Sequence, residues 1–138
     1  MLEHTFIHIP GIGPKTERHL WWNGILTWKD FLSTKKTPLS LVRDSFVRRN
    51  LEASLENRNN IRFFLDKLSP ADIWRLFGKF KDKAVYLDIE TSGLYQGVDE
   101  ITVIGLYDGK TAKTFVQGIN LVEFESEVNT YELVITFN

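Results

Sequence analysis

The sequence predicts a protein of the mixed α+β or α/β class, with a helical N-terminal region followed by a mixed sheet. Apolar residues before position 84 recur at the helical spacings of three and four, whereas those after it alternate with polar residues as in strands. Asp108-Gly109 lies between two of the alternating runs and is typical of a tight hairpin turn. We therefore expect a helical region over residues 1–80 and a sheet over residues 84–138, joined by a short basic linker near Lys79–Lys83.

The helices expected in the first region each have a boundary signal. Asn23-Gly24 closes a first helix, and Thr27 with Asp30 resembles a capping box that opens a second. A longer helix begins near Leu41, and a short one begins at Ser69-Pro70. Aromatic residues on short amphipathic helices are usually buried, so we expect core positions, rather than stacking on bases, for Trp21, Trp22 and Trp28.

Four strands and one helix are expected after residue 83. The strands are predicted at Ala84–Glu90, Glu100–Tyr107, Thr111–Val116 and Glu132–Phe137, and the helix at Leu121–Asn129. Three strands followed by a helix and a strand predict an antiparallel meander whose last strand crosses over to a parallel neighbour.

Composition excludes several classes of protein. There is no cysteine, so disulfides and thiolate metal sites are excluded and a cytoplasmic location is expected. No apolar run is long enough for a membrane span, and the first residues do not have the pattern of a secretory signal. His4, His8 and His19 are not accompanied by the acids or cysteines of a zinc site, so we expect surface or packing roles for them.

Charge is distributed unevenly along the chain. Residues through Lys83 include 15 Lys/Arg against 9 Asp/Glu, whereas the residues from Ala84 onward include 2 Lys/Arg against 9 Asp/Glu. One interpretation is that the first region holds a polyanion and the second holds cations. The alternative is that two small regions differ only in surface charge.

Asp88 and Glu90 form the most informative pair of residues. Residues two apart on a strand project to the same face, so the two carboxylates are expected side by side. Paired carboxylates repel each other unless a cation or a proton is shared, and all-oxygen ligands suit Mg²⁺ or Mn²⁺. Metals held in this way serve phosphodiester hydrolysis. The alternative is that an Asp-x-Glu pair only decorates a solvated strand face.

The longer string Asp-Ile-Glu-Thr-Ser-Gly-Leu at residues 88–94 resembles the first motif of the DEDD exonucleases, which have an RNase H-like fold. Residues 98–109 and 132–138 resemble two further strands of the YprB-like RNase H family. The resemblance implies a 3′-5′ exonuclease in which Asp88 and Glu90 are catalytic metal ligands for Mg²⁺ or Mn²⁺. It also implies that Thr91 and Ser92 lie near the scissile nucleotide and that Leu94 lies against a terminal base.

The sequence departs from that family in one respect, because it stops at Asn138, before the remaining metal-ligand motifs. We therefore expect an N-terminal fragment of a nuclease that is inactive by itself. Two alternatives remain open: a nucleic-acid-binding adaptor with a degenerate nuclease fold, and a purely structural interaction domain. The sequence does not distinguish DNA from RNA as the partner.

The segment Ile-Pro-Gly-Ile-Gly-Pro-Lys at residues 9–15 resembles the loop of a helix-hairpin-helix element, which binds DNA without reading its sequence. Gly11 and Gly13 allow a tight turn that brings backbone N–H groups close to a phosphate. Lys15 adds a positive charge at the start of the following helix. The alternative is a loop that only packs helices together.

Overall fold

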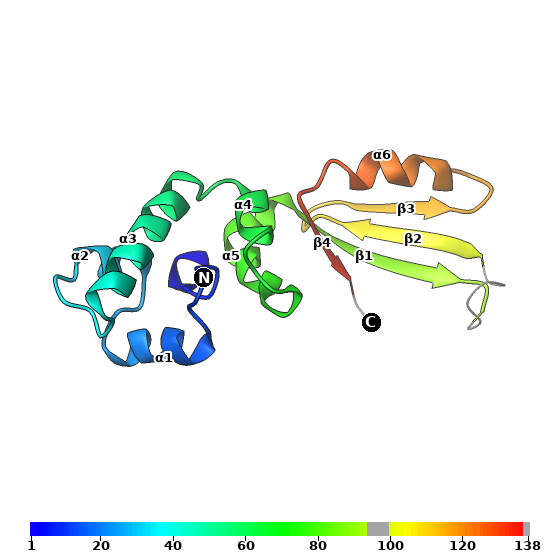
Figure 1. Ribbon diagram of the computed structural model, residues 1–138. Coiled ribbons are helices and arrows are strands. Elements are labelled where there is room, and N and C mark those ends of the chain that lie inside the picture. The colour runs from blue at the N-terminus through cyan, green and yellow to red at the C-terminus, as the bar shows by residue number, and fades with distance from the viewer. Residues whose placement is uncertain (94–99, 137–138) are drawn as a thin grey trace. The chain divides into compact units, whose positions relative to one another are not determined.

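The computed structural model describes residues 1–93 and 100–136 and divides into two compact units, Met1–Lys79 and Phe80–Asn138. Helices followed by a four-stranded mixed sheet confirm the predicted fold class (Figure 1). In the described part of the chain, no helix has the length and apolar character that a membrane crossing requires.

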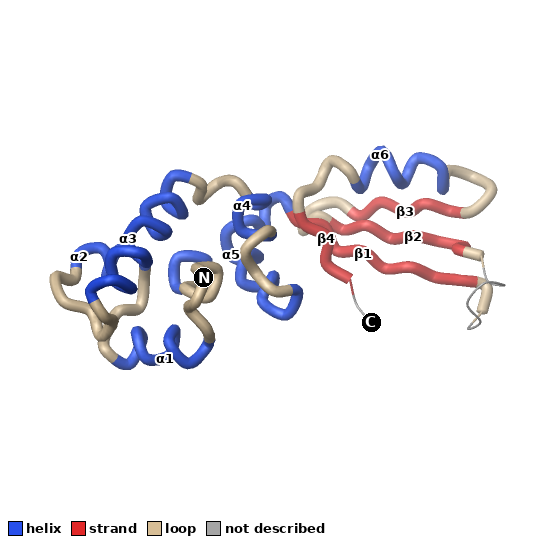
Figure 2. Tube along the Cα trace, viewed as in Figure 1, coloured by secondary structure: helices blue, strands red, loops and turns tan. Residues whose placement is uncertain are grey.

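The helical region, coloured by secondary structure in Figure 2, consists of one helix of 16 residues and several shorter ones. Its helices are α1 (Pro14–Trp22), α2 (Trp28–Ser33), α3 (Leu41–Glu56), α4 (Ile61–Leu65) and α5 (Phe77–Phe80). The capping box at the start of α2 is confirmed, because Thr27 Oγ1 accepts from Asp30 N at 3.1 Å and Asp30 Oδ2 accepts from Thr27 N at 2.8 Å. The segment expected as a helix after Ser69 is instead a 3₁₀ helix, Pro70–Leu76, followed by α5.

Trp28 is at the centre of the core of the first unit. Its ring is fully buried and stacks on Phe64 at a centroid distance of 5.8 Å, and its Nε1–H donates to the carbonyl of Thr5 at 2.7 Å. The core position predicted for Trp28 is therefore confirmed, but the one predicted for Trp22 is wrong, since that side chain is 80% exposed. Trp22 is the last residue of α1, and the residues of this helix that enter the core are Glu17 and Leu20, three apart on another face.

His8 is buried in the same core between Trp28 and Phe64, with ring centroid distances of 5.3 and 5.6 Å. The Ser54 hydroxyl donates to Asn50 O at 2.7 Å and lies 2.9 Å from His8 Nε2, so the Nε2–H donates to Ser54. Burial in this apolar site lowers the pKa of His8 from 6.5 to about 4. The ring is therefore neutral near pH 7.

The depressed pKa of His8 predicts a pH-dependent stability. The unfolded state binds the proton of His8 more tightly than the folded state does, so protonation of this histidine favours unfolding. The free energy of unfolding is therefore unaffected by protonation of His8 above pH 6.5 and falls by about 3 kcal/mol as the pH is lowered towards about 4. Urea denaturation of the wild type and of His8→Gln over this pH range measures the contribution, with His19→Gln, which replaces an exposed histidine, as the control. Parallel pH profiles for the wild type and His8→Gln would contradict the prediction.

The second unit is a four-stranded sheet with the order β3-β2-β1-β4. Its strands are β1 (Ala84–Thr91), β2 (Ile101–Tyr107), β3 (Ala112–Val116) and β4 (Leu133–Thr136). Neighbouring strands β1, β2 and β3 are antiparallel, and β4 pairs with β1 in parallel after the helix α6 (Phe124–Val128). The predicted meander and parallel crossover are confirmed.

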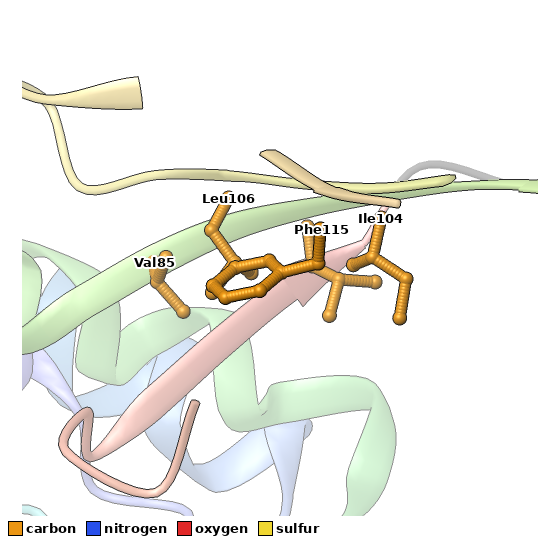
Figure 3. Close-up of a cluster of buried hydrophobic side chains, with 5 residues drawn as sticks. Val85, Ile104, Leu106 and Phe115 are labelled. Carbon is orange, nitrogen blue, oxygen red and sulfur yellow. The ribbon is translucent and has the colours of Figure 1, made fainter. Parts of the chain in front are cut away.

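The hydrophobic core of this unit lies on one face of the sheet. Its buried side chains, most of which are labelled in Figure 3, are Val85, Leu87, Ile104, Leu106 and Phe115. Residues from the segment that contains α6 cover them, namely Leu121, Phe124, Val128 and Tyr131. Because side chains alternate along a strand, this core directs the even-numbered residues of β1 to the opposite face.

Candidate metal centre and nucleic-acid interface

Strand β1 positions the two carboxylates that the sequence singled out. Val85 and Leu87 are buried in the core, so Asp88 and Glu90 both project from the opposite face, and both are exposed. The pairing of β1 with β2 is regular from Tyr86 to Glu90, so no irregularity separates the two acids.

The residue opposite Asp88 leaves space next to its carboxylate. Asp88 pairs with Gly105 of β2, which has no side chain. A Cβ atom added to Gly105 would meet no other atom within 4 Å. The surface beside Asp88 is therefore open to a small ligand.

A β-bulge follows directly after Glu90. Glu90 pairs with Val103 and Thr91 with Ile101, so Thr102 is an extra residue on β2. The Thr102 hydroxyl donates to the carbonyl of Glu90 at 3.1 Å and fixes the bulge. Bulges are frequent next to active sites, where they redirect side chains and end the pairing of strands.

The hydroxyl groups of Thr91 and Ser92 contact the backbone beyond the bulge. Thr91 Oγ1 donates to the carbonyl of Gly93 at 2.7 Å, and Ser92 Oγ accepts from Glu100 N at 3.0 Å. Both residues are exposed at the same end of β1 as Glu90. Leu94, the third residue expected near a bound nucleotide, lies outside the described residues.

Three other acids of the sheet unit, Glu127, Glu132 and Asp108, have partners. Glu127 pairs with Lys113 at 2.7 Å, and this hydrogen bond lowers the pKa of Glu127 and raises the pKa of Lys113. Glu132 pairs with Lys83 at 2.5 Å. The backbone amides of Thr111 and Lys110 bond to the Asp108 carboxylate and lower its pKa.

Asp88 and Glu90 differ from these acids. Within the part of the chain that the structure describes, neither carboxylate has a hydrogen-bond or ion-pair partner. Two exposed, unneutralised carboxylates on one strand face fit a hard divalent cation, which prefers oxygen ligands. Across residues 1–93 and 100–136, however, no group of three or more His, Cys, Asp or Glu residues is arranged to hold a metal ion.

The glycine-rich loop of the first unit places Gly11 and Gly13 in different conformations. Gly11 has a φ of 79°, in the left-handed region that favours glycine, whereas Gly13 has an extended backbone with a φ of −95°. Gly13 is the N-cap of α1, and a Cβ atom there would meet nothing within 4 Å. The loop therefore needs glycine at position 11 for its backbone, whereas at position 13 the missing side chain leaves open space.

Backbone donors are available where the loop meets α1. The N–H groups of Lys15 and Thr16 lie in the first turn and have no carbonyl partner within the helix, and no side chain caps this end. Lys15 is exposed. The element before the loop is a single 3₁₀ turn, Leu2–His4, so the resemblance to a two-helix hairpin rests on the loop and on α1.

Glu17 of α1 fixes the segment that precedes the glycine-rich loop, a role that the sequence did not reveal. Its carboxylate is buried, and its Oε1 accepts from the N–H of Phe6 at 2.7 Å and of Ile7 at 3.3 Å. Arg75 neutralises it from the other side at 3.1 Å. A glutamate on a helix is usually exposed to solvent, and the burial of Glu17 is accounted for by the two backbone donors together with the distant arginine.

Comparison with known proteins finds one family match, which lies in the second unit. Residues 85–138 match the family model of the RNase H superfamily. The match begins at β1 and includes Asp88, Glu90 and all four strands. No curated protein and no solved structure matches the chain.

Proposed function

From the RNase H superfamily domain in residues 85–138, we propose that this chain carries part of a metal-dependent nuclease, a 3′-5′ exonuclease that hydrolyses phosphodiester bonds. The observation that carries the proposal is the pair Asp88 and Glu90, which share one exposed strand face and have no other partner among the described residues. Proteins of this superfamily typically depend on a metal, and Mg²⁺ or Mn²⁺ suits these ligands.

Each residue near the end of β1 has a distinct task in this proposal. Asp88 and Glu90 supply anionic oxygens and concentrate cations at the strand end. Gly105 leaves room beside Asp88 for the ion and a phosphate oxygen. A divalent ion bound there supplies the positive charge that activates water and stabilises the leaving oxygen.

The nucleotide end of the substrate is proposed to lie against the segment after Glu90. Thr91 and Ser92 shape that segment through their bonds to Gly93 and Glu100, and both remain exposed. If the 3′ end of a nucleic acid binds there, its terminal phosphodiester lies close to the carboxylate pair. Catalysis requires the reacting groups to be held in this way.

The first unit is proposed to bind the nucleic acid through its glycine-rich loop. The open N-terminus of α1, with the N–H groups of Lys15 and Thr16, favours a phosphate. The space at Gly13 permits close approach, and Lys15 adds charge without reading bases. The expected binding is independent of sequence and weakens steeply with salt.

A second candidate is a nucleic-acid-binding adaptor with a degenerate nuclease domain. It is favoured by one observation, namely that the described residues contain no third ligand beside Asp88 and Glu90. In that case the basic first unit binds nucleic acid and the sheet unit contributes no metal-dependent step.

Metal-dependent binding of an oligonucleotide separates the two candidates. Fluorescence anisotropy of a labelled single-stranded oligonucleotide is measured with and without Mn²⁺, using the wild type, Asp88→Asn, Glu90→Gln and the control Glu125→Gln. Glu125 is an exposed acid of the same unit that lies outside the site. A nuclease site predicts that Mn²⁺ strengthens binding to the wild type and to the control but not to the two site variants. An equal effect of Mn²⁺ on all four proteins supports the adaptor.

A further inference from the structure

A hollow of about 340 Å³ lies between the glycine-rich loop and α3 in the first unit. Its apolar lining comes from Pro10 and Ile12 of the loop segment and from Val42 and Phe46 of α3, and its charged lining from Arg43 and Arg49. A neighbouring hollow of about 300 Å³ shares Phe46 and Arg49. We call the surface formed by these residues the α3 groove.

The two apolar side chains that α3 contributes to the α3 groove are exposed. Val42 is 82% exposed and Phe46 is 39% exposed, whereas Val47 and Leu51 are the α3 residues that enter the core. The α3 helix therefore presents a second apolar surface that no described residue covers. The aromatic ring of Phe46 on this surface is available to pack against a flat apolar group.

The charge of the α3 groove is positive. Arg43 and Arg49 line it and no carboxylate does. The nearest acid in sequence, Asp44, is already bonded to Arg48 at 2.6 Å and to the Thr37 hydroxyl at 2.7 Å. Arg49 has no partner among the described residues, so its guanidinium is available to an anion.

The groove is continuous with the loop proposed to hold a phosphate. Arg43 donates to the carbonyl of Gly11 at 2.7 Å and so ties the loop to α3. A chain of phosphates bound at the loop would pass next to Arg43 and Arg49. Alternating phosphates and bases match a surface that combines guanidinium groups with an exposed aromatic ring.

We propose that the α3 groove binds a nucleotide of single-stranded nucleic acid, with its base against Phe46 and its phosphates on Arg43 and Arg49. The inference rests on the proposed binding of nucleic acid by the first unit. It adds that the first unit recognises an unpaired base and its neighbouring phosphates. A single strand is required because a base in a duplex is stacked on its neighbours and cannot reach Phe46.

The test uses the full chain and a labelled oligothymidylate in low salt with EDTA, so that no metal-dependent step contributes. The variants are Phe46→Leu, which keeps the side chain apolar but removes stacking, and Arg49→Gln. Arg58→Gln is the matched control, because Arg58 is exposed, lacks a partner in the described residues and does not line the groove. Thermal unfolding confirms that each variant is folded.

The expected result is a loss of affinity of about fivefold or more for Phe46→Leu, as removal of one stacked base predicts. Arg49→Gln is expected to weaken binding more than Arg58→Gln, and Phe46→Leu is expected to affect a duplex less than the single strand. Equal losses for Arg49→Gln and Arg58→Gln, with none for Phe46→Leu, would overturn the inference. Binding of an acidic peptide in place of the oligonucleotide would also overturn it and assign the groove to a protein partner.

The outcome is distinguishable from failure of the proposed nuclease site. If Lys15→Gln weakens binding and the groove variants do not, the loop still holds nucleic acid and only the groove inference fails. If the groove variants weaken binding but Mn²⁺ has no effect that depends on Asp88 or Glu90, the nuclease proposal fails and the groove inference stands.

Discussion

Replacing Glu17 with alanine is expected to lower the free energy of unfolding of the first unit by about 3 kcal/mol or more. The Glu17 side chain is 2% exposed and accepts two backbone N–H groups, from Phe6 and Ile7. Its removal leaves these donors without an acceptor and takes away one of the two carboxylates that neutralise Arg75.

Tryptophan fluorescence during urea denaturation measures this effect. All four tryptophans lie within Met1–Lys79, so the signal reports on the first unit. Glu52→Ala is the control, because Glu52 is an exposed acid on α3 of the same unit, and its replacement is expected to change stability by about 0.5 kcal/mol or less. If Glu17→Ala is as stable as Glu52→Ala, the buried contacts of Glu17 with Phe6, Ile7 and Arg75 do not stabilise the first unit.

The 138-residue chain by itself is expected to show no metal-dependent nuclease activity. A two-metal site needs several fixed ligands and a group that positions water. The proposed site has two carboxylates, Asp88 and Glu90, and the described residues contain no group of three or more His, Cys, Asp or Glu residues arranged to hold a metal ion. Loss of members from a cooperating site typically costs orders of magnitude in rate. We therefore expect no detectable nuclease activity, rather than a low rate of cleavage.

Digestion of labelled single- and double-stranded DNA and RNA with Mn²⁺ tests this expectation. The wild type is compared with Glu90→Gln, so that contaminating nuclease is recognised as activity common to both. Cleavage by the wild type that disappears in Glu90→Gln would contradict the ligand count. It would mean that further ligands come from outside the described residues, for example from a second copy of the chain.

The sheet unit was largely predictable because its signals are local. Alternating apolar residues define β1, and the same alternation places Asp88 and Glu90 together on the face opposite the core. The Asp108-Gly109 turn sets the pairing of β2 with β3. The bulge at Thr102 was not predictable, because the alternation of apolar and polar residues does not indicate which residue of β2 has no partner on β1.

The first unit was less predictable because its key contacts join residues far apart in sequence. The burial of Glu17 depends on Arg75, and the burial of His8 depends on Ser54. On α3, Val47 and Leu51 are buried at the spacing of four that a helix predicts, whereas the neighbouring Phe46 is 39% exposed. Helix periodicity predicts that a helix forms, but its packing partners decide which face is covered.

Mn²⁺ titration followed by NMR tests most directly whether Asp88 and Glu90 form part of a divalent metal site at the end of β1. Bound Mn²⁺ broadens the signals of nearby backbone amides, so the position of the ion is read from the sequence of affected residues. Glu125→Gln removes the same charge from the same unit and serves as the control. We predict broadening centred on Asp88, Glu90 and Gly105 in the wild type and in Glu125→Gln, and its loss in Asp88→Asn and Glu90→Gln. Unchanged broadening in Asp88→Asn, or broadening centred on α6, would contradict the claim.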